Sequence, residues 1–172
     1  QLNIDFEVKP SKIIEPIYKD DISPLKYCKN LSKLKANEIY KKHNDTLIIG
    51  ADTIVVINKE VLGKPLNKKN AYAMLIKLSG KYHEVITAVT VIYNNIFHTF
   101  SNSTMVKFFK LNEREILKYI NTSSPYDKAG SYGIQDWFGL IAVEHINGSY
   151  SNVVGLPVYE VFHKIKEIIS KN

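Results

Sequence analysis

The chain has 172 residues, of which 45% are hydrophobic and 23% charged, as in an ordinary globular protein. This length favours one domain that buries a core without a disulfide or a structural metal. Cys28 is the only cysteine, which excludes an internal disulfide and a multi-cysteine zinc site and favours a reducing, cytoplasmic setting. We find no apolar run long enough to span a membrane and no signal peptide. The net charge of +6 suits nucleic acid, a membrane surface or a phosphorylated small molecule, but the lysines are too scattered for an obvious nucleic-acid stripe.

The first half of the chain predicts strand, helix and strand. Ile4–Val8 alternates in hydrophobicity, which is typical of a strand, and the chain starts there without a methionine, as if cut. An irregular stretch with two prolines follows, at 9–21. Ser23-Pro24 then predicts the start of a helix that runs to about His43, with Leu25, Cys28, Leu31 and Leu34 on one side. The run Leu47–Ile57 predicts a strand that is buried on both faces.

The middle of the chain predicts a helix and a long hairpin. A turn or short hairpin at 58–65 precedes a helix over Lys68–Leu78, which Gly80 ends. Two strands, at about 83–93 and 96–109, are joined by Asn94-Asn95, a hairpin signal.

The last part of the chain predicts two more helices and a strand. Asn112 and Glu115 form a capping-box pattern before a helix that ends near Ile120. Loops and a short helical turn are expected at 123–137, then a strand at 138–146 that ends at Asn147-Gly148, and an amphipathic helix at about 157–170. With no repeat or linker, the pattern indicates one mixed α/β domain.

Asp52 is the most informative residue for chemistry, because it interrupts the apolar run Ile48–Val56. An unpaired buried aspartate costs several kcal/mol, so this residue must reach a partner, a metal or a cleft. Gly50 and Ala51 beside it leave room for a ligand. The same pattern also fits a structural aspartate that caps a backbone group.

Two later motifs carry further candidates. Lys64, between Gly63 and Pro65, can neutralise a phosphate, although a solvated turn lysine fits equally. Asp127 and Lys128 lead to Gln135, whose amide both donates and accepts and can therefore read the edge of a nucleobase. Without other support, this stretch fits a solvated loop.

The remaining candidates are weaker. His83 and Thr87 alternate on one strand face, and His83 by itself fits a structural histidine. Lys33 and Lys35 are two residues apart on a helix, so at most one of them points into a site.

The order of these motifs along nearly the whole chain closely resembles the Maf family of nucleotide pyrophosphatases. The motifs that carry the resemblance are Leu31-Ser32-Lys33-Leu34-Lys35-Ala36, Gly50-Ala51-Asp52-Thr53, Leu62-Gly63-Lys64-Pro65, Ala71–Leu78 with Ser79-Gly80, His83-Glu84-Val85-Ile86-Thr87, Asp127-Lys128-Ala129-Gly130, Tyr132-Gly133-Ile134-Gln135 and Asn152-Val153-Val154-Gly155-Leu156-Pro157.

The resemblance implies an α/β fold with an elongated mixed β-sheet flanked by helices, similar to the inosine triphosphate pyrophosphatases. It implies hydrolysis of a nucleoside triphosphate between the α- and β-phosphates, with a divalent cation, Mg²⁺ or Mn²⁺. Asp52 would orient and deprotonate the attacking water, while Lys35, Lys64 and Lys128 would neutralise the phosphates. Glu15 would help Asp52 hold the metal, and a homodimer is expected.

Within the family, the pairs Asp52-Thr53 and Ile134-Gln135 resemble the branch that acts on dTTP and UTP. The resemblance thus implies canonical or modified pyrimidine triphosphates as the target, the latter in house-cleaning of nucleotide pools. Substrate-binding roles would fall to Thr53, Gln135, Asp127, His83 and Thr87, besides the lysines.

The chain departs from the family at its start, where no Ser-x-Ser-Pro-Arg-Arg segment is found. We therefore expect a single domain, 1–172, that lacks the first strand, phosphate-binding loop and helix, and that hydrolyses dTTP far more slowly than a chain carrying them. Two rivals stay open. A nucleic-acid-binding module would bind oligonucleotides in a salt-sensitive way, and a regulator of division would sense nucleotide without turnover.

Overall fold

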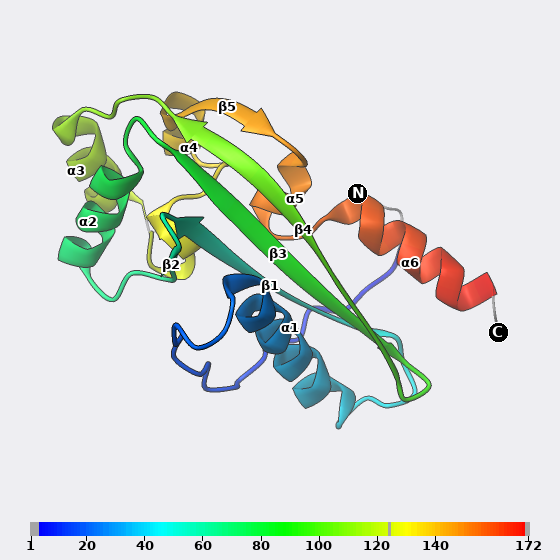
Figure 1. Ribbon diagram of the computed structural model, residues 1–172. Helices are drawn as coiled ribbons and strands as arrows, with labels where there is room; N and C mark the ends of the chain where they lie inside the picture. The colour runs from blue at the N-terminus through cyan, green and yellow to red at the C-terminus, as the bar shows by residue number, and fades with distance from the viewer. Residues whose placement is uncertain (1–3, 124, 171–172) are drawn as a thin grey trace.

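A five-stranded sheet organises the protein, and helices cover both of its faces (Figure 1). The computed structural model describes residues 4–123 and 125–170. The elements in chain order are α1 Pro24–Tyr40, β1 Ile48–Ile57, β2 Glu60–Leu62, α2 Lys68–Leu78, β3 Tyr82–Tyr93, β4 Ile96–Phe108, α3 Glu113–Thr122, 3-10 turns at Pro125–Asp127 and Ala129–Ser131, α4 Trp137–Ala142, β5 Val143–Asn147, α5 Tyr150–Val154 and α6 Val158–Ser170.

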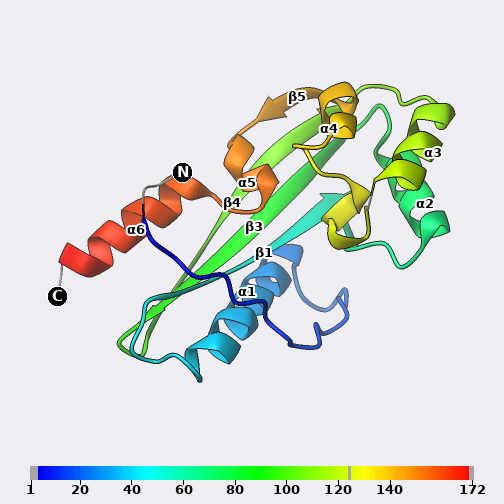
Figure 2. The ribbon, with the colours of Figure 1, turned by 180° about the vertical axis from the view of Figure 1, so that it is seen from behind.

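The sheet has the strand order β2-β1-β3-β4-β5, and the strand pairs of the described residues are antiparallel. This confirms the α/β class and the helix-flanked sheet, with antiparallel pairing where a mixed sheet was expected. The long β3–β4 hairpin elongates the sheet, as expected: it reaches out beside α1 at one end, while α2 and α3 gather at the other (Figures 1 and 2).

Successive side chains of each strand point to opposite faces of the sheet, and hydrophobic clusters pack on both faces. On one face, Cys28 of α1 packs with Ile54, Val56, Ile86 and Ala88 of the sheet. On the other face, α2, α3 and α4 enclose a larger cluster that includes Val55, Val85 and Phe108. Helix α6 covers Val89 and Val91 farther along that second face. None of the helices in 4–123 and 125–170 is long and apolar enough to cross a membrane.

Several elements confirm their sequence signals. Helix α2 has the predicted bounds, and Asn112 and Glu115 of α3 form the predicted capping box. Asn94 and Asn95 both have positive φ, 46° and 61°, the conformation that a tight hairpin turn with both central residues left-handed requires.

The predicted strand at Ile4–Val8 is wrong. This segment is extended but belongs to none of the sheet's strand pairs, and Phe6 and Val8 are 80% and 77% exposed. A strand needs the edge of a neighbour, which periodicity does not reveal. The segment instead runs along α1 (Figure 2). There Ser11 Oγ and Lys12 N both donate to Glu38 Oε2, at 2.6 and 2.8 Å.

Helix α1 ends at Tyr40, three residues before the predicted end, and its buried face includes Cys28, Leu31 and Ala36. Leu25 and Leu34, expected on that face, are 41% and 44% exposed. The buried face of α1 is therefore rotated relative to the predicted one. It is set by a close contact between Ala36 and Gly50, where an added Cβ on Gly50 would lie 2.6 Å from Ala36 N.

The predicted strand at 138–146 is wrong in its first half, which forms α4, while β5 follows at Val143–Asn147. Phe138 and Ala142, four residues apart, both face the core, and Phe138 stacks on Tyr119 with ring centroids 4.4 Å apart. A short apolar run fits a buried helix as well as a strand, so periodicity could not decide. The short helix α5 was not predicted. Residue 124, within the predicted loop 123–137, lies outside the described residues.

Candidate functional site

Strand β1 presents consecutive side chains to opposite faces of the sheet. Asp52 follows Gly50 on the face that α1 covers, whereas Thr53 shares the other face with Ala51 and Val55. Strand β2 pairs with β1 only at 55–57, so among the described strands the stretch around Asp52 pairs with β3 alone. A ligand at this edge can therefore touch both faces.

Asp52 is 8% exposed and forms a charged cluster with Lys35 and Glu15. Lys35 Nζ donates to Asp52 Oδ1 in a short ion pair and lies 2.9 Å from Glu15 Oε1. Lys35 reaches Asp52 because the close contact between Ala36 and Gly50 brings α1 against β1. The cluster thus pairs one lysine with two carboxylates.

Burial raises the pKa of Asp52 above its ordinary value, against the attraction of Lys35, which lowers it. Glu15 adds a small raising effect and the ammonium of Lys64 a lowering one. Burial lowers the pKa of Lys35, but the two carboxylates outweigh it, so the net shift is upward. Lys35 therefore stays charged, and the Asp52 carboxyl is a stronger base than an exposed aspartate.

Cys28 lies beneath Asp52. Its Sγ donates to the backbone carbonyl of Asp52 at 3.2 Å and lies 3.9 Å from Oδ2. Burial, followed by the charge of Asp52, raises the pKa of this thiol to about 12. Cys28 is thus a neutral packing residue at neutral pH and not a nucleophile.

On the opposite face, hydroxyl groups link Thr53 to the sheet. Thr53 Oγ1 lies 2.9 Å from Thr87 Oγ1, and Thr87 donates to the carbonyl of Asn152 at 2.8 Å. Asn152 lies in α5 and is the first residue of the motif 152–157, which continues past the end of that helix. Its Nδ2 donates to Val85 O and to Thr104 Oγ1, each at 3.0 Å, which attaches α5 to the sheet.

The loop 127–136 lies beside the loop that carries Gly63 and Lys64. Gly130 N donates to Gly63 O at 3.1 Å, next to Lys64. Lys128 Nζ lies 2.8 Å from Asp127 Oδ1 and 3.8 Å from Asp136 Oδ2. Tyr119 OH donates to the same Asp136 oxygen at 2.9 Å.

These parts enclose a cleft of about 280 Å³. Its lining includes seven predicted site residues, brought from four separate stretches of the chain: Lys35, Asp52, Thr53, Lys64, Asp127, Lys128 and Gln135. The lining combines charged side chains from α1, β1 and two loops with neutral ones, such as Thr53, Gln135, Val153 and Val154. Such a mixed lining suits a ligand with an anionic part and a neutral part.

Three other predicted residues do not line this cleft. Glu15 reaches it only through Lys35, and Thr87 is fully buried behind Thr53. His83 is 1% exposed, its Nε2 lies 2.8 Å from Tyr132 OH, and burial lowers its pKa to about 4. In the structure His83 is a neutral packing residue under the Tyr132 part of the wall.

Asp136 and Asn152 were missed as site residues. Asp136 contacts Lys128 and lines the cleft, but in the sequence it is one of several polar residues in a loop. Asn152 belongs to a motif that the sequence highlighted without a role, and only its burial beside Thr87 reveals one.

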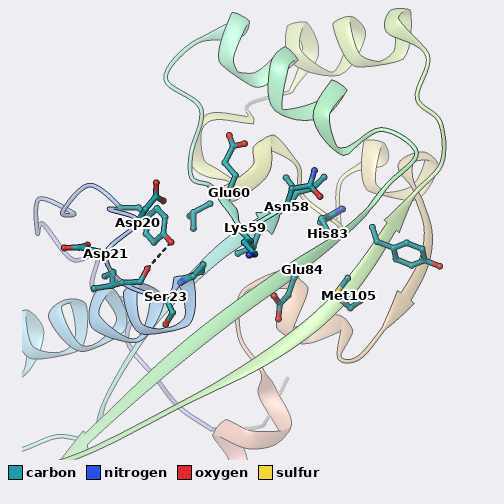
Figure 3. A pocket seen from close by; sticks show the side chains of 16 residues that line it. Asp20, Asp21, Ser23, Asn58, Lys59, Glu60, His83, Glu84 and Met105 are labelled. Atoms are coloured by element: carbon teal, nitrogen blue, oxygen red, sulfur yellow. Dashed lines mark hydrogen bonds between the residues drawn. The ribbon is translucent and has the colours of Figure 1, made fainter.

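A larger hollow of about 960 Å³ lies elsewhere, between the segment before α1 and the β1–β2 turn. Figure 3 shows Asp20, Asp21 and Ser23 on one side of it and Glu84 and Met105 on the other. Of the predicted site residues only His83 borders it. The smaller cleft at Asp52 is therefore the candidate site.

The donor set at Asp52 fits a divalent cation. Asp52 and Glu15 already converge on one positive charge, the Lys35 ammonium. In 4–123 and 125–170, no group of three or more His, Cys, Asp or Glu side chains could hold a metal. Mg²⁺ usually takes one or two carboxylates and completes its shell with water and phosphate oxygens, so two carboxylates suffice.

Comparison with known proteins decides the family, because the sequence model of the Maf-like proteins matches residues 1–168. The chain belongs to the Maf family. It is similar to the dTTP/UTP pyrophosphatase of Thermosipho africanus, 49% identical over 94% of this chain and 81% of that protein. The proteins of the same name from Thermosipho melanesiensis (51% identical, 94% of this chain and 85% of that protein covered) and Parabacteroides distasonis (45%; 96% and 86%) are also similar.

Proposed function

We propose that this Maf protein is a nucleoside triphosphate pyrophosphatase that hydrolyses dTTP and UTP to the monophosphate and pyrophosphate. The observation that carries the proposal is the cleft itself, in which the buried Asp52 pairs with Lys35 and shares the lining with Lys64, Lys128, Thr53 and Gln135. The names of the similar proteins support the same substrates.

In this proposal Asp52 is the general base. Its carboxylate orients a water molecule, takes one proton from it, and lets the oxygen form a bond to the α-phosphorus. The bond from that phosphorus to the bridging oxygen breaks, and pyrophosphate leaves with the electron pair. Burial supports this role, because it raises the pKa of Asp52 and makes the carboxylate more basic.

The lysines stabilise negative charge on the triphosphate. Lys64 and Lys128 come from two loops that the hydrogen bond from Gly130 N to Gly63 O joins, and both residues line the cleft. Lys35 pairs with Asp52 and lines the same cleft, where its ammonium would attract the triphosphate. Positive groups fixed in a partly buried cleft interact with developing charge more strongly than the same groups in water.

We propose Mg²⁺, or Mn²⁺ in its place, as the cofactor, with Asp52 and Glu15 as its protein ligands. When bound, this ion supplies Lewis-acid polarisation of the phosphate oxygens. We also propose that the enzyme works in the cytoplasm, where the free thiol of Cys28 would stay reduced, and as a homodimer. Light scattering of the purified protein tests the dimer.

A nucleotide panel tests the function. Pyrophosphate release is measured with Mg²⁺ and dTTP, UTP, dCTP, GTP or ITP, and dTTP and UTP are expected to be the best substrates. Asp52→Asn should lower kcat by about 10²–10⁴, the usual contribution of a general base, while nucleotide binding persists. Asp45→Asn makes the same chemical change on the exposed turn before β1 and serves as the matched control.

The outcomes separate the proposal from its rivals. If ITP were the best substrate, the pyrimidine assignment would be wrong. A nucleotide sensor would bind without turnover in the unmodified protein. A nucleic-acid module would bind oligonucleotides in a salt-sensitive way and ignore the Asp52 substitution.

A further inference from the structure

The hydrogen bonds around Thr87 determine to which atom the Thr53 hydroxyl donates its hydrogen. The carbonyl oxygen of Asn152 can only accept, so Thr87 Oγ1, 2.8 Å away, must donate to it. A hydroxyl carries a single hydrogen. In its 2.9 Å contact with Thr53, Thr87 must therefore accept, and Thr53 must donate.

The consequence for the cleft is that Thr53 Oγ1 has no hydrogen left for a ligand. Thr53 lines the cleft, and its oxygen presents lone pairs only. A ligand atom that meets it must be a donor, because an acceptor would face an unpaired oxygen.

The arrangement is rigid because its inner members are buried. Thr87 and Asn152 are fully buried, and Asn152 is held by two further hydrogen bonds from its side-chain amide. If Thr53 turned its hydrogen toward the cleft, the buried Thr87 oxygen would lose the donor that Thr53 supplies to it. Reversal is therefore costly.

The surroundings of Thr53 favour a base as the ligand. Ala51, Val55 and Val85 lie on the same face of the sheet, and the cleft wall adds Val153 and Val154. The ion pair of Lys35 and Asp52 lies on the opposite face, and the other charged groups of the loop wall, Asp127, Lys128 and Asp136, pair with one another. A flat, neutral group with one N–H fits this apolar stretch.

We propose that Thr87 and the Asn152 carbonyl leave the Thr53 hydroxyl able only to accept a hydrogen bond from a ligand. This selects bases with a ring N–H donor, such as the imide of thymine or uracil. Cytosine carries an acceptor at the corresponding ring nitrogen and is rejected. Thr87 is a positioning residue that acts through Thr53. The inference rests on the proposed function for the identity of the ligand.

The test compares the binding of non-hydrolysable α,β-methylene analogues of dTTP and dCTP to the full chain by calorimetry. We expect Thr87→Val to lower the dTTP preference about tenfold or more, because Thr53 becomes free to donate to cytosine. Thr87→Ser, which keeps the hydroxyl, should retain the preference. Thr90→Val is the matched control, since Thr90 is a buried threonine of β3 that bonds Ser32 on the opposite face.

A second arm changes the ligand and needs no variant. Methylation of the thymine ring nitrogen should weaken binding to the unmodified protein about tenfold or more, whereas removal of the sugar 3′-hydroxyl should not reproduce that loss. Equal loss from the sugar change, or an unchanged preference in folded Thr87→Val, overturns the inference. Because binding is measured separately from pyrophosphate release, lack of turnover would refute the proposed function and leave this polarity test valid.

Discussion

Replacing Lys35 with methionine should destabilise the protein through Asp52. The variant removes the cation that pairs with Asp52 and Glu15, and it leaves a carboxylate that is only 8% exposed without its partner. Removal of one member of a buried ion pair costs about 3–5 kcal/mol. Because Lys35 keeps 19% exposure, solvent screens part of this, and we expect about 3 kcal/mol. For a domain of this size, that corresponds to a Tm lowered by about 6–12 °C.

The loss should depend on pH in a definite direction. Burial holds the folded-state pKa of Asp52 above its unfolded value, and removal of Lys35 raises it further. Between the two values the folded state binds more protons than the unfolded state, so the free energy of unfolding falls as pH rises. The penalty is complete above the folded pKa and shrinks as pH falls through it, because a protonated carboxyl needs no cation.

Urea unfolding at about pH 7 and about pH 5 measures this effect. Lys33→Met is the matched control, because Lys33 is an exposed lysine two residues away on the same helix. Combining Lys35→Met with Asp52→Asn should recover most of the stability, since no buried charge remains. Equal losses for Lys33→Met and Lys35→Met, or a loss that Asp52→Asn does not relieve, would refute the reasoning.

Three further variants follow from local geometry. Gly50→Ala places a methyl 2.6 Å from the backbone nitrogen of Ala36, so α1 must shift. We expect the free energy of unfolding to fall by about 1–3 kcal/mol and kcat/KM to fall as well. Gly63→Ala is the control in the same thermal melt and should keep its stability, because a Cβ there meets no atom within 4 Å. Gly133→Ala meets flexible side-chain ends of the cleft wall, so kcat/KM should fall while Tm changes little. His83 has a folded-state pKa of about 4, below its unfolded value, so stability should be lost as pH falls from about 6.5 toward 4, by up to about 3 kcal/mol, and unfolding of His83→Gln should lack this component.

Elements with local signals could be predicted from the sequence. Helix α2 has an Asn67 cap and an uninterrupted helical pattern, and the Asn94-Asn95 turn needs only its own two residues to reverse the chain. The segment Ile4–Val8 has the alternation of a strand, but whether it pairs depends on an edge elsewhere in the fold. The helix α4 was missed because its apolar residues fit both periodicities, and packing against Tyr119 decided between them.

The sequence predicted most of the residues that line the candidate site but not how they lie relative to one another. The order of motifs pointed to Asp52, Lys64 and Lys128, which do line one cleft. Helix spacing by itself left open whether Lys33 or Lys35 faces Asp52, and the resemblance chose Lys35. In the structure this depends on the rotation of α1 against Gly50. Their roles in catalysis remain predictions.

The alternation of one strand explains why two neighbouring residues serve different purposes. Asp52 and Thr53 are adjacent in β1, yet their side chains lie on opposite faces, one with Lys35 and Cys28 and the other with Thr87. In the proposed function the face with Lys35 serves phosphate chemistry, and the stretch around Thr53 serves recognition of a base. A change at Thr87 can therefore alter base preference without touching the carboxylate, whereas a change at Lys35 acts on the carboxylate and leaves the Thr53 hydroxyl alone. Measured together, the two variants should show independent effects, because within the described residues the two networks are joined through the backbone of β1 and not through a side-chain hydrogen bond.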